Sequence, residues 1–154
     1  MKWIAFVLSF FVSVSALAAD PAYDEQADAN KEIQQALLDA AKAKVPVILI
    51  FGANWCPDCR VLDTAMKSGA AAPLMARDFR VVKINVGRFD RNTDIAQAYG
   101  VPLKKGIPAV AILSANNEVL YATRSGELAD ARAMGDSGIH EFLKRAAAST
   151  RAGS

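Results

Sequence analysis

Apolar and polar positions follow two different periods along this chain. One uninterrupted apolar run rich in β-branched residues, 45–51, is typical of a strand that is covered on both faces. The segment 79–86 is predicted as a second buried strand. Two further predicted strands, 107–114 and 118–125, are joined by a short turn-rich link and predict an antiparallel hairpin. The sheet therefore combines buried strands with a hairpin.

The segments between these runs have helical spacing. The first, from Asp28 to Lys44, places Ile33 and Leu37 on one face, with Asp28 or Asn30 as possible N-caps. Further helices are predicted over these ranges: 57–67, 71–77, 94–99 and 137–148, the last with Ser137 as a possible cap. This order of elements predicts an α/β domain over residues 28–149, in which a mixed sheet carries helices on both faces. The tail over 150–154 is expected to fray.

The N-terminal stretch "MKWIAFVLSFFVSVSALAAD" has one positive charge, a short apolar run and a small-residue triplet. This pattern predicts a signal peptide over residues 1–18, cleaved after Ala18, because the apolar run is too short for the roughly 20 residues of a spanning helix. An uncleaved anchor is the weaker alternative. We therefore expect a periplasmic protein, or alternatively a secreted one, with a loose leader over residues 19–27.

Charge and cysteine count narrow the possible functions. The chain has 18 basic and 16 acidic residues, and loss of Lys2 with the signal peptide leaves a net charge of +1, which gives no reason to expect a nucleic-acid partner. We expect a monomer. The remaining residues are enough for an ordinary hydrophobic core, so the domain does not need disulfide stapling. The two cysteines therefore call for another explanation.

Both cysteines lie in "GANWCPDCRVLD", between a predicted strand and a predicted helix. Cys56 comes at the helix N-terminus, where free amides and the helix dipole favour a thiolate, and Pro57 suits the first turn. Cys59 follows on nearly the same side of the helix. This arrangement predicts disulfide exchange without a cofactor, with Cys56 as the exposed attacking thiolate and Cys59 as the thiol that resolves the mixed disulfide.

Three alternatives explain the same pair less well. A structural bridge would close a very short loop and constrain the unfolded chain little. A closed zinc site needs four protein ligands, whereas the chain offers only one histidine, His140, as a further soft ligand, so we predict no metal site. A non-catalytic copper(I) carrier or dithiol binding module stays open, because soft thiolates suit that ion. We assign no role to His140.

The segment "FGANWCPDC" resembles the active-site strand and turn of the thioredoxin superfamily. The resemblance extends over residues 31–148 through "VVKINV", "AYGVPLKKGIPAVAIL" and "NNEVLYATRSG". It implies a thioredoxin fold and a Cys56–Cys59 pair that cycles between dithiol and disulfide. A thiol–disulfide oxidoreductase is the expected activity.

Four further residues take their expected roles from this resemblance. Pro108 matches the cis-proline that faces the cysteines and leaves the preceding backbone free to pair with an extended substrate. Lys83 matches a lysine near the active site, although a plain charge at a sheet edge explains it equally well. Trp55 would shield the sulfurs. Ile107, before the proline, is common in reducing thioredoxins.

The chain departs from the thioredoxin pattern directly upstream of the cysteines. Thioredoxins bury an aspartate where this chain has Ile50, and that acid assists proton transfer at the resolving thiol. Asp58, Lys83 or water would have to substitute for it. Gly52 stands where thioredoxins often have a second tryptophan.

Two insertions also distinguish the chain. Residues 101–106 include three extra positions, with Lys104 and Lys105 expected on a loop near the sulfurs, where they could favour a thiolate or an acidic partner or simply be solvated. Residues 127–136 separate the hairpin from the last helix, and the sequence assigns them no purpose.

The direction of electron flow is predicted from the charge at Asp58. A carboxylate beside the Cys56 thiolate opposes the very low thiol pKa of strong oxidants, and Ile107 favours the same direction by resemblance. We therefore expect a reductant of exported proteins that contain disulfides. Such a protein needs a membrane thiol electron donor to reduce it again.

Overall fold

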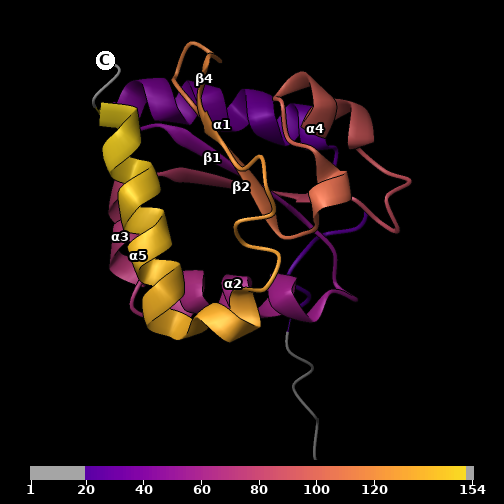
Figure 1. Ribbon diagram of the computed structural model, residues 1–154. Coiled ribbons are helices and arrows are strands. Elements are labelled where there is room, and N and C mark those ends of the chain that lie inside the picture. Colours follow the sequence, from indigo (N-terminus) through magenta and orange to yellow (C-terminus); the bar gives the residue numbers. More distant parts are fainter. Residues whose placement is uncertain (1–19, 152–154) are drawn as a thin grey trace, which may run out of the picture.

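The computed structural model describes residues 20–151, which form a four-stranded mixed sheet between two helical layers (Figure 1). The strand order is β2-β1-β3-β4, with β2 parallel to β1 and the other neighbours antiparallel. The elements in chain order are α1 (Ala29–Ala43), β1 (Val47–Gly52), α2 (Pro57–Ser68), α3 (Ala72–Asp78), β2 (Arg80–Asn85), α4 (Thr93–Ala98), the 3-10 turn η1 (Leu103–Lys105), β3 (Ala109–Leu113), β4 (Val119–Ala122) and α5 (Ala131–Arg151). This is the thioredoxin fold that the sequence predicts.

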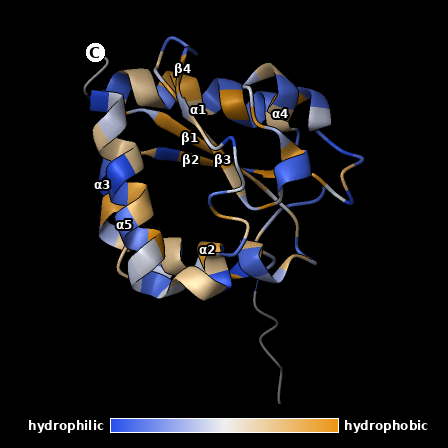
Figure 2. Ribbon diagram, in the orientation of Figure 1, coloured by the Kyte–Doolittle hydropathy of each residue, from blue (hydrophilic) through white to orange (hydrophobic). Residues whose placement is uncertain are grey.

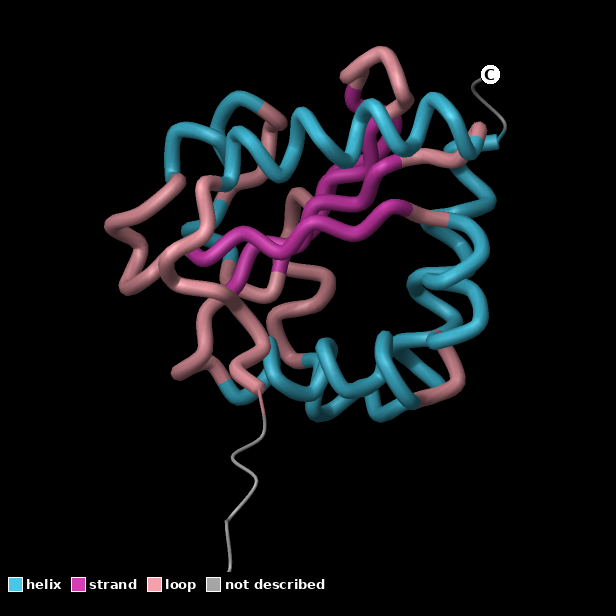
Figure 3. The backbone as a smooth tube through the Cα atoms, turned by 180° about the vertical axis from the view of Figure 1, so that it is seen from behind, coloured by secondary structure: helices cyan, strands magenta, loops and turns pink. Residues whose placement is uncertain are grey.

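The central strand β1 divides the core in two. Its six residues are all buried, with Val47, Leu49 and Phe51 on the face covered by α1 and α4. Ile48 and Ile50 point to the opposite face, which packs on α2, α3 and α5. Figure 2 shows the apolar strands between the helices, and Figure 3 shows α1 lying along the sheet from behind. The apolar run at 45–51 is therefore a doubly covered strand.

The first predicted helix has the expected start. The Asp28 carboxylate accepts a hydrogen bond from the Lys31 amide at 3.2 Å and so caps α1. The short helices α3 and α4 lie within one residue of their predicted ranges, and the strands of the β3–β4 hairpin end within three residues of theirs. Helical and strand periods therefore located these elements correctly.

The C-terminal region differs from its prediction at both ends. α5 starts at Ala131, six residues before the predicted cap Ser137, and is interrupted by a non-helical Gly135 with φ 66°. The predicted frayed tail is wrong for residues 150 and 151, because the helix continues through them and Thr150 is buried. Residues 152–154 lie outside the described part.

The leader is also different from its prediction. Residues 20–28 contain no helix or strand, but Tyr23 is only 1% exposed and packs in the core on the α1 side of the sheet. A loose leader is therefore the wrong description of this segment. The predicted signal peptide over residues 1–18 lies outside the described residues.

Within residues 20–151, no helix is both long enough and apolar enough to cross a membrane.

Candidate active site

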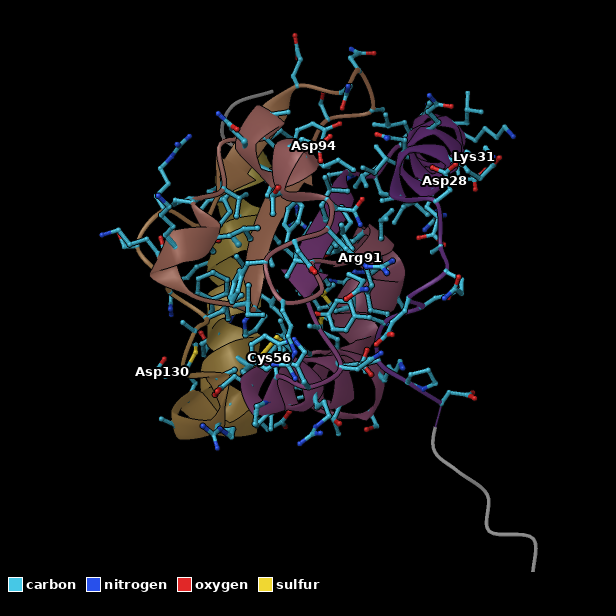
Figure 4. All side chains as sticks on the ribbon, turned by 90° about the vertical axis from the view of Figure 1, so that its right-hand side faces the viewer. Asp28, Lys31, Cys56, Arg91, Asp94 and Asp130 are labelled. Carbon is cyan, nitrogen blue, oxygen red and sulfur yellow. A yellow bond between two sulfur atoms is a disulfide. The ribbon has the colours of Figure 1, made fainter. Side chains whose placement is uncertain are left out.

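The two cysteines lie at the start of α2, directly after β1. Cys56 is the N-cap residue with extended backbone (φ −83°, ψ 113°), and Pro57 occupies the first helical position, where no amide hydrogen is needed. The Cys59 amide donates to the Cys56 sulfur at 3.2 Å. Figure 4 marks Cys56 at this end of α2. A thiolate at Cys56 would thus receive a backbone hydrogen bond and the positive end of the helix dipole.

Cys56 and Cys59 form a disulfide, with their Cα atoms 5.2 Å apart. The predicted pairing is therefore present. Cys56 is 4% exposed and Cys59 is fully buried. The expectation of an exposed Cys56 is thus too strong, since most of the residue is covered, but only Cys56 of the two has any contact with solvent.

The loop before β3 approaches the disulfide from the opposite side. The Ile107–Pro108 peptide bond is cis, as the family resemblance implies. The Ile107 carbonyl oxygen lies 3.7 Å from the Cys56 sulfur, and both Ile107 and Pro108 are buried. Residues 51 positions apart in sequence therefore meet at Cys56.

Trp55 lies against the loop after β2. The residue is 44% exposed, and its Nε1 donates to the Gly87 carbonyl oxygen at 2.8 Å. The Arg88 guanidinium lies 5.6 Å from the Trp55 ring centroid, and the Phe89 ring packs edge-on at 6.1 Å. Trp55 thus belongs to an exposed aromatic and cationic cluster next to the disulfide, and its shielding of the sulfurs stays a prediction.

An open groove lies next to the cis-proline loop. Its walls include Phe89, Val101, Leu103, Lys104 and Arg124. The lining therefore combines apolar surface with two cations. Its position against Gly106, one residue before Ile107, places the groove within reach of a chain segment that lies along the cis-proline loop.

Asp58 points away from Cys56 and toward α5. Its Oδ1 accepts hydrogen bonds from the Arg132 amide at 3.0 Å and from the Arg132 Nε at 3.3 Å. Burial acts to raise the pKa of Asp58, but the hydrogen bonds and charge of Arg132 together outweigh it and hold the pKa below its usual range. Asp58 is therefore ionised but paired, which corrects the picture of an uncompensated charge beside the thiolate.

The insertion at 127–136 braces the active-site helix. Leu128 and Ala131 are fully buried, and Arg132 forms the contact with Asp58. Asp136 accepts two hydrogen bonds from the Ala70 amide, at 3.0 and 3.2 Å, after the end of α2. The insertion thus fastens both ends of α2 to the start of α5.

Lys83 is part of a charged cluster under the site. Its Nζ lies 2.6 Å from Oδ1 of Asp63, and Lys67 Nζ lies 2.8 Å from Oδ2 of the same residue. Asp63 is 8% exposed and stands one helical turn after Cys59, a spacing that could have identified it from sequence. Ile50 is fully buried opposite Lys83 in the β1–β2 register. The strand position where thioredoxins bury an aspartate is therefore occupied by an apolar side chain.

Tyr23 joins the leader to the active-site turn. Its amide donates to Asn54 Oδ1 at 2.8 Å, and Asn54 Nδ2 donates back to the Tyr23 carbonyl oxygen at 2.9 Å. Its phenol fills the space in front of Gly52, where an added Cβ would collide with the ring. The glycine at a buried strand end was the available sequence signal, because such glycines mark the close approach of another group.

Across residues 20–151, no cluster of three or more His, Cys, Asp or Glu side chains could hold a metal ion.

Three comparisons with known proteins agree with this geometry. The chain is 46% identical to the crystal structure of a disulphide isomerase from Xylella fastidiosa Temecula1, over 83% of this chain and 98% of the other, with a TM-score of 0.80. It is 31% identical over 94 residues to a thioredoxin from Pseudomonas aeruginosa, covering 58% of this chain and 74% of that protein. A thioredoxin from Thermus thermophilus shares the fold at 21% identity over 73% of this chain and 79% of the other, with a TM-score of 0.51.

The match to a protein family covers the site itself. Residues 28–115 match the thioredoxin-like family and include both cysteines, Lys83 and the cis-proline. The relatives support thiol–disulfide oxidoreductase chemistry in general terms. With more than half of its residues inside the match, the chain belongs to the thioredoxin-like family.

Proposed function

We propose that this protein is an exported thiol–disulfide oxidoreductase that reduces disulfides in other exported proteins. The observation that carries the proposal is the Cys56–Cys59 disulfide at the start of α2, with the Cys56 sulfur 3.7 Å from the Ile107 carbonyl oxygen. The sulfur that has to meet a substrate thus adjoins the backbone that can hold it.

The reaction begins from the dithiol form. The Cys56 thiolate attacks one sulfur of a substrate disulfide, forms a mixed disulfide and releases the other substrate sulfur as a thiolate. Cys59 then loses its proton and attacks the Cys56 sulfur, which forms the intramolecular disulfide and releases the second substrate thiolate. The substrate gains two electrons and the protein loses two.

Substrate binding is assigned to the cis-proline loop and the groove beside it. An extended segment next to the substrate disulfide can pair with the backbone before Pro108. The groove can receive a neighbouring apolar side chain, and Lys104 and Arg124 on its wall favour a segment that carries an acid. The exposed ring of Trp55 offers further contact area next to Cys56.

Reduction rather than oxidation is proposed on two grounds. Ile107 precedes the cis-proline, as in reducing thioredoxins, and the 46% identical relative is described as a disulphide isomerase, an activity that also starts from a reduced thiol. The charge of Asp58, which the sequence suggested as an argument for a reductant, carries less weight because Asp58 is paired with Arg132. A protein that donates electrons outside the cytoplasm requires a membrane thiol donor as partner.

Insulin reduction by dithiothreitol or glutathione, with and without the protein, tests the activity. The wild-type chain should accelerate precipitation of the insulin B chain, and Cys56→Ser should abolish the acceleration. A redox equilibrium with glutathione then tests the direction. A potential near that of strong disulfide oxidants, about −120 mV, would contradict the reductant.

Trapping in the native cell tests the location and the substrates. Cys59→Ser removes the resolving thiol, so exported partners should accumulate as mixed disulfides on Cys56, which reducing electrophoresis releases. Mass spectrometry of the mature N-terminus should find cleavage after Ala18. Partners drawn only from the cytoplasm would contradict export, and tight copper(I) binding without any turnover would favour a carrier instead.

A further inference from the structure

One side of the Cys59 sulfur faces a tyrosine that the reaction above does not use. Gly52 is the last residue of β1, and Cys59 lies in α2, the helix that follows. A Cβ placed on Gly52 would lie 3.0 Å from the Cys59 sulfur and would collide with the Tyr23 hydroxyl oxygen. The hydroxyl and the sulfur therefore border the same small space.

Tyr23 is fixed in this position by its backbone. Its amide and carbonyl are both hydrogen-bonded to the Asn54 side chain, two residues before Cys56, and the residue is almost completely buried. Among residues 20–151, the hydrogen bonds found for Tyr23 use its amide and its carbonyl oxygen and not its hydroxyl group. Burial, and to a smaller extent the negative charge of Asp63, raise the pKa of Tyr23 far above its usual value, so the phenol stays a proton donor.

The charged groups around this space are already engaged with one another. From α2, both carboxylate oxygens of Asp63 bind lysines, namely Lys67 of the same helix and Lys83 of β2. β1 contributes no charge over residues 47–52. From the leader, Glu25 accepts a hydrogen bond from Asn54, and the charge of Asp20 acts on Lys67. The Tyr23 hydroxyl thus adjoins the Cys59 sulfur across the space in front of Gly52, while these charged groups bind one another.

We propose that, when the disulfide opens, the Tyr23 hydroxyl donates a hydrogen bond to the Cys59 sulfur and stabilises its thiolate. Tyr23 is thus a positioning residue for the resolving step and compensates for the missing acid at Ile50. Its own proton stays on the phenol. The Cys59 proton passes to a base in solvent, and the freed electron pair of Cys59 forms the bond to the Cys56 sulfur. The role in resolution rests on the proposed function.

The hydrogen bond can be tested without turnover in a Cys56→Ala background. Thiolate absorbance at 240 nm then reports the titration of Cys59 alone, because no other cysteine is present. Adding Tyr23→Phe removes the hydroxyl but keeps the ring that packs on Gly52. Since hydrogen bonds to charged groups are strong, we expect the thiolate fraction below the midpoint to fall about tenfold. Tyr121→Phe, on β4 against Phe142, is the matched control and should leave the titration unchanged.

A second substitution changes the donor in the opposite direction. With Tyr99 and Tyr121 replaced by phenylalanine, Tyr23 is the one tyrosine left, and 3-fluorotyrosine can be incorporated there alone. The more acidic phenol should donate a stronger hydrogen bond and move the Cys59 titration to lower pH. A merely structural tyrosine would move the titration in neither variant, and that result would overturn the proposal.

Turnover separates this proposal from the proposed function. In the two-cysteine protein, Tyr23→Phe should slow release of substrate from the mixed disulfide about tenfold near neutral pH, with recovery at higher pH, while the first attack by Cys56 keeps its rate. If the wild-type protein exchanges disulfides but the Cys59 titration is the same with and without the Tyr23 hydroxyl, only the present inference fails. If the titration responds and wild type shows no exchange, only the proposed function fails.

Discussion

The two sulfurs of one disulfide have opposite surroundings. The Cys56 sulfur meets the Ile107 carbonyl and the cis-proline loop, with the exposed Trp55 next to it in sequence. The Cys59 sulfur is buried beneath the helix start and faces Tyr23 at the end of β1. We infer that the surroundings of Cys56 serve to bind the substrate, whereas those of Cys59 control the protonation of its thiol. Substitutions on the two sides should therefore have separable effects.

The largest effect is expected from filling the space on the Cys59 side. Gly52→Ala forces a methyl group against the Tyr23 phenol and the Cys59 sulfur, and overpacking of this kind costs about 1–3 kcal/mol. Urea unfolding at neutral pH measures the loss. Because Tyr23→Leu removes the ring that blocks this space, the same alanine should cost less in that background. An equal cost in both backgrounds would show that Tyr23 is not the obstacle.

The charged cluster beneath Cys59 comes next. Asp63→Asn leaves Lys83 and Lys67 without their shared carboxylate, and partial exposure of the lysines reduces the cost to about 1–2 kcal/mol. Urea unfolding provides the measurement. Asp39→Asn, at an exposed position on α1 with a weak contact to Lys42, is the control and should change stability little. Equal losses of stability in Asp63→Asn and Asp39→Asn would mean that the buried cluster contributes no more to stability than an exposed ion pair.

On the Cys56 side, Asp58 should make stability depend on pH. Its pKa in the folded protein is below the ordinary 3.8, so its contribution is fully present above that pH and is lost as the pH falls through the folded pKa. Asp58→Asn should therefore destabilise the protein at pH 7. The difference between the two proteins should shrink below about pH 4. Urea midpoints over this range test the prediction, and a constant difference would refute it.

Trp55 should give the smallest change in stability. Trp55→Phe loses the hydrogen bond to the Gly87 carbonyl oxygen, and the exposure of the ring limits the cost to about 0.5–1 kcal/mol. Its effect should instead be found in the KM for insulin, with the Cys59 titration unchanged. Val119→Ala, an exposed apolar residue on β4, is the control for both measurements. A shifted Cys59 titration in Trp55→Phe would show that the surroundings of Cys56 and Cys59 do not act independently.

The sequence alone predicted most of the elements, although not the start of α5, and it predicted the residues on the Cys56 side of the disulfide. Strand β1 is a continuous apolar run, and the Cys56–Pro57 start of α2 follows from capping rules, so both were located without tertiary information. The cis bond at Pro108 came from the family resemblance, because an X–Pro bond taken alone is cis in only about 5–6% of cases. Local patterns and family motifs thus identified the Cys56 side.

Other parts of the site depend on contacts that no local pattern contains. Tyr23 is a single aromatic residue in an aperiodic segment, and its partner Asn54 is 31 positions away. The contact of Asp58 with Arg132 spans 74 positions and lies in an insertion outside the motif. Side chains that meet only after the chain has folded cannot be paired from spacing, so the leader was misjudged and the insertion was left without a role.

The hydrogen bonds between Tyr23 and Asn54 have a consequence for how the protein is produced. A recombinant form that begins at Asp28, the cap of α1, would retain every helix and strand but lose the phenol next to Cys59. Likewise, an affinity tag joined within a few residues of Tyr23 would adjoin the redox centre rather than an inert end. Biochemical comparisons of this protein therefore need matched N-termini, with any tag placed at the other end of the chain.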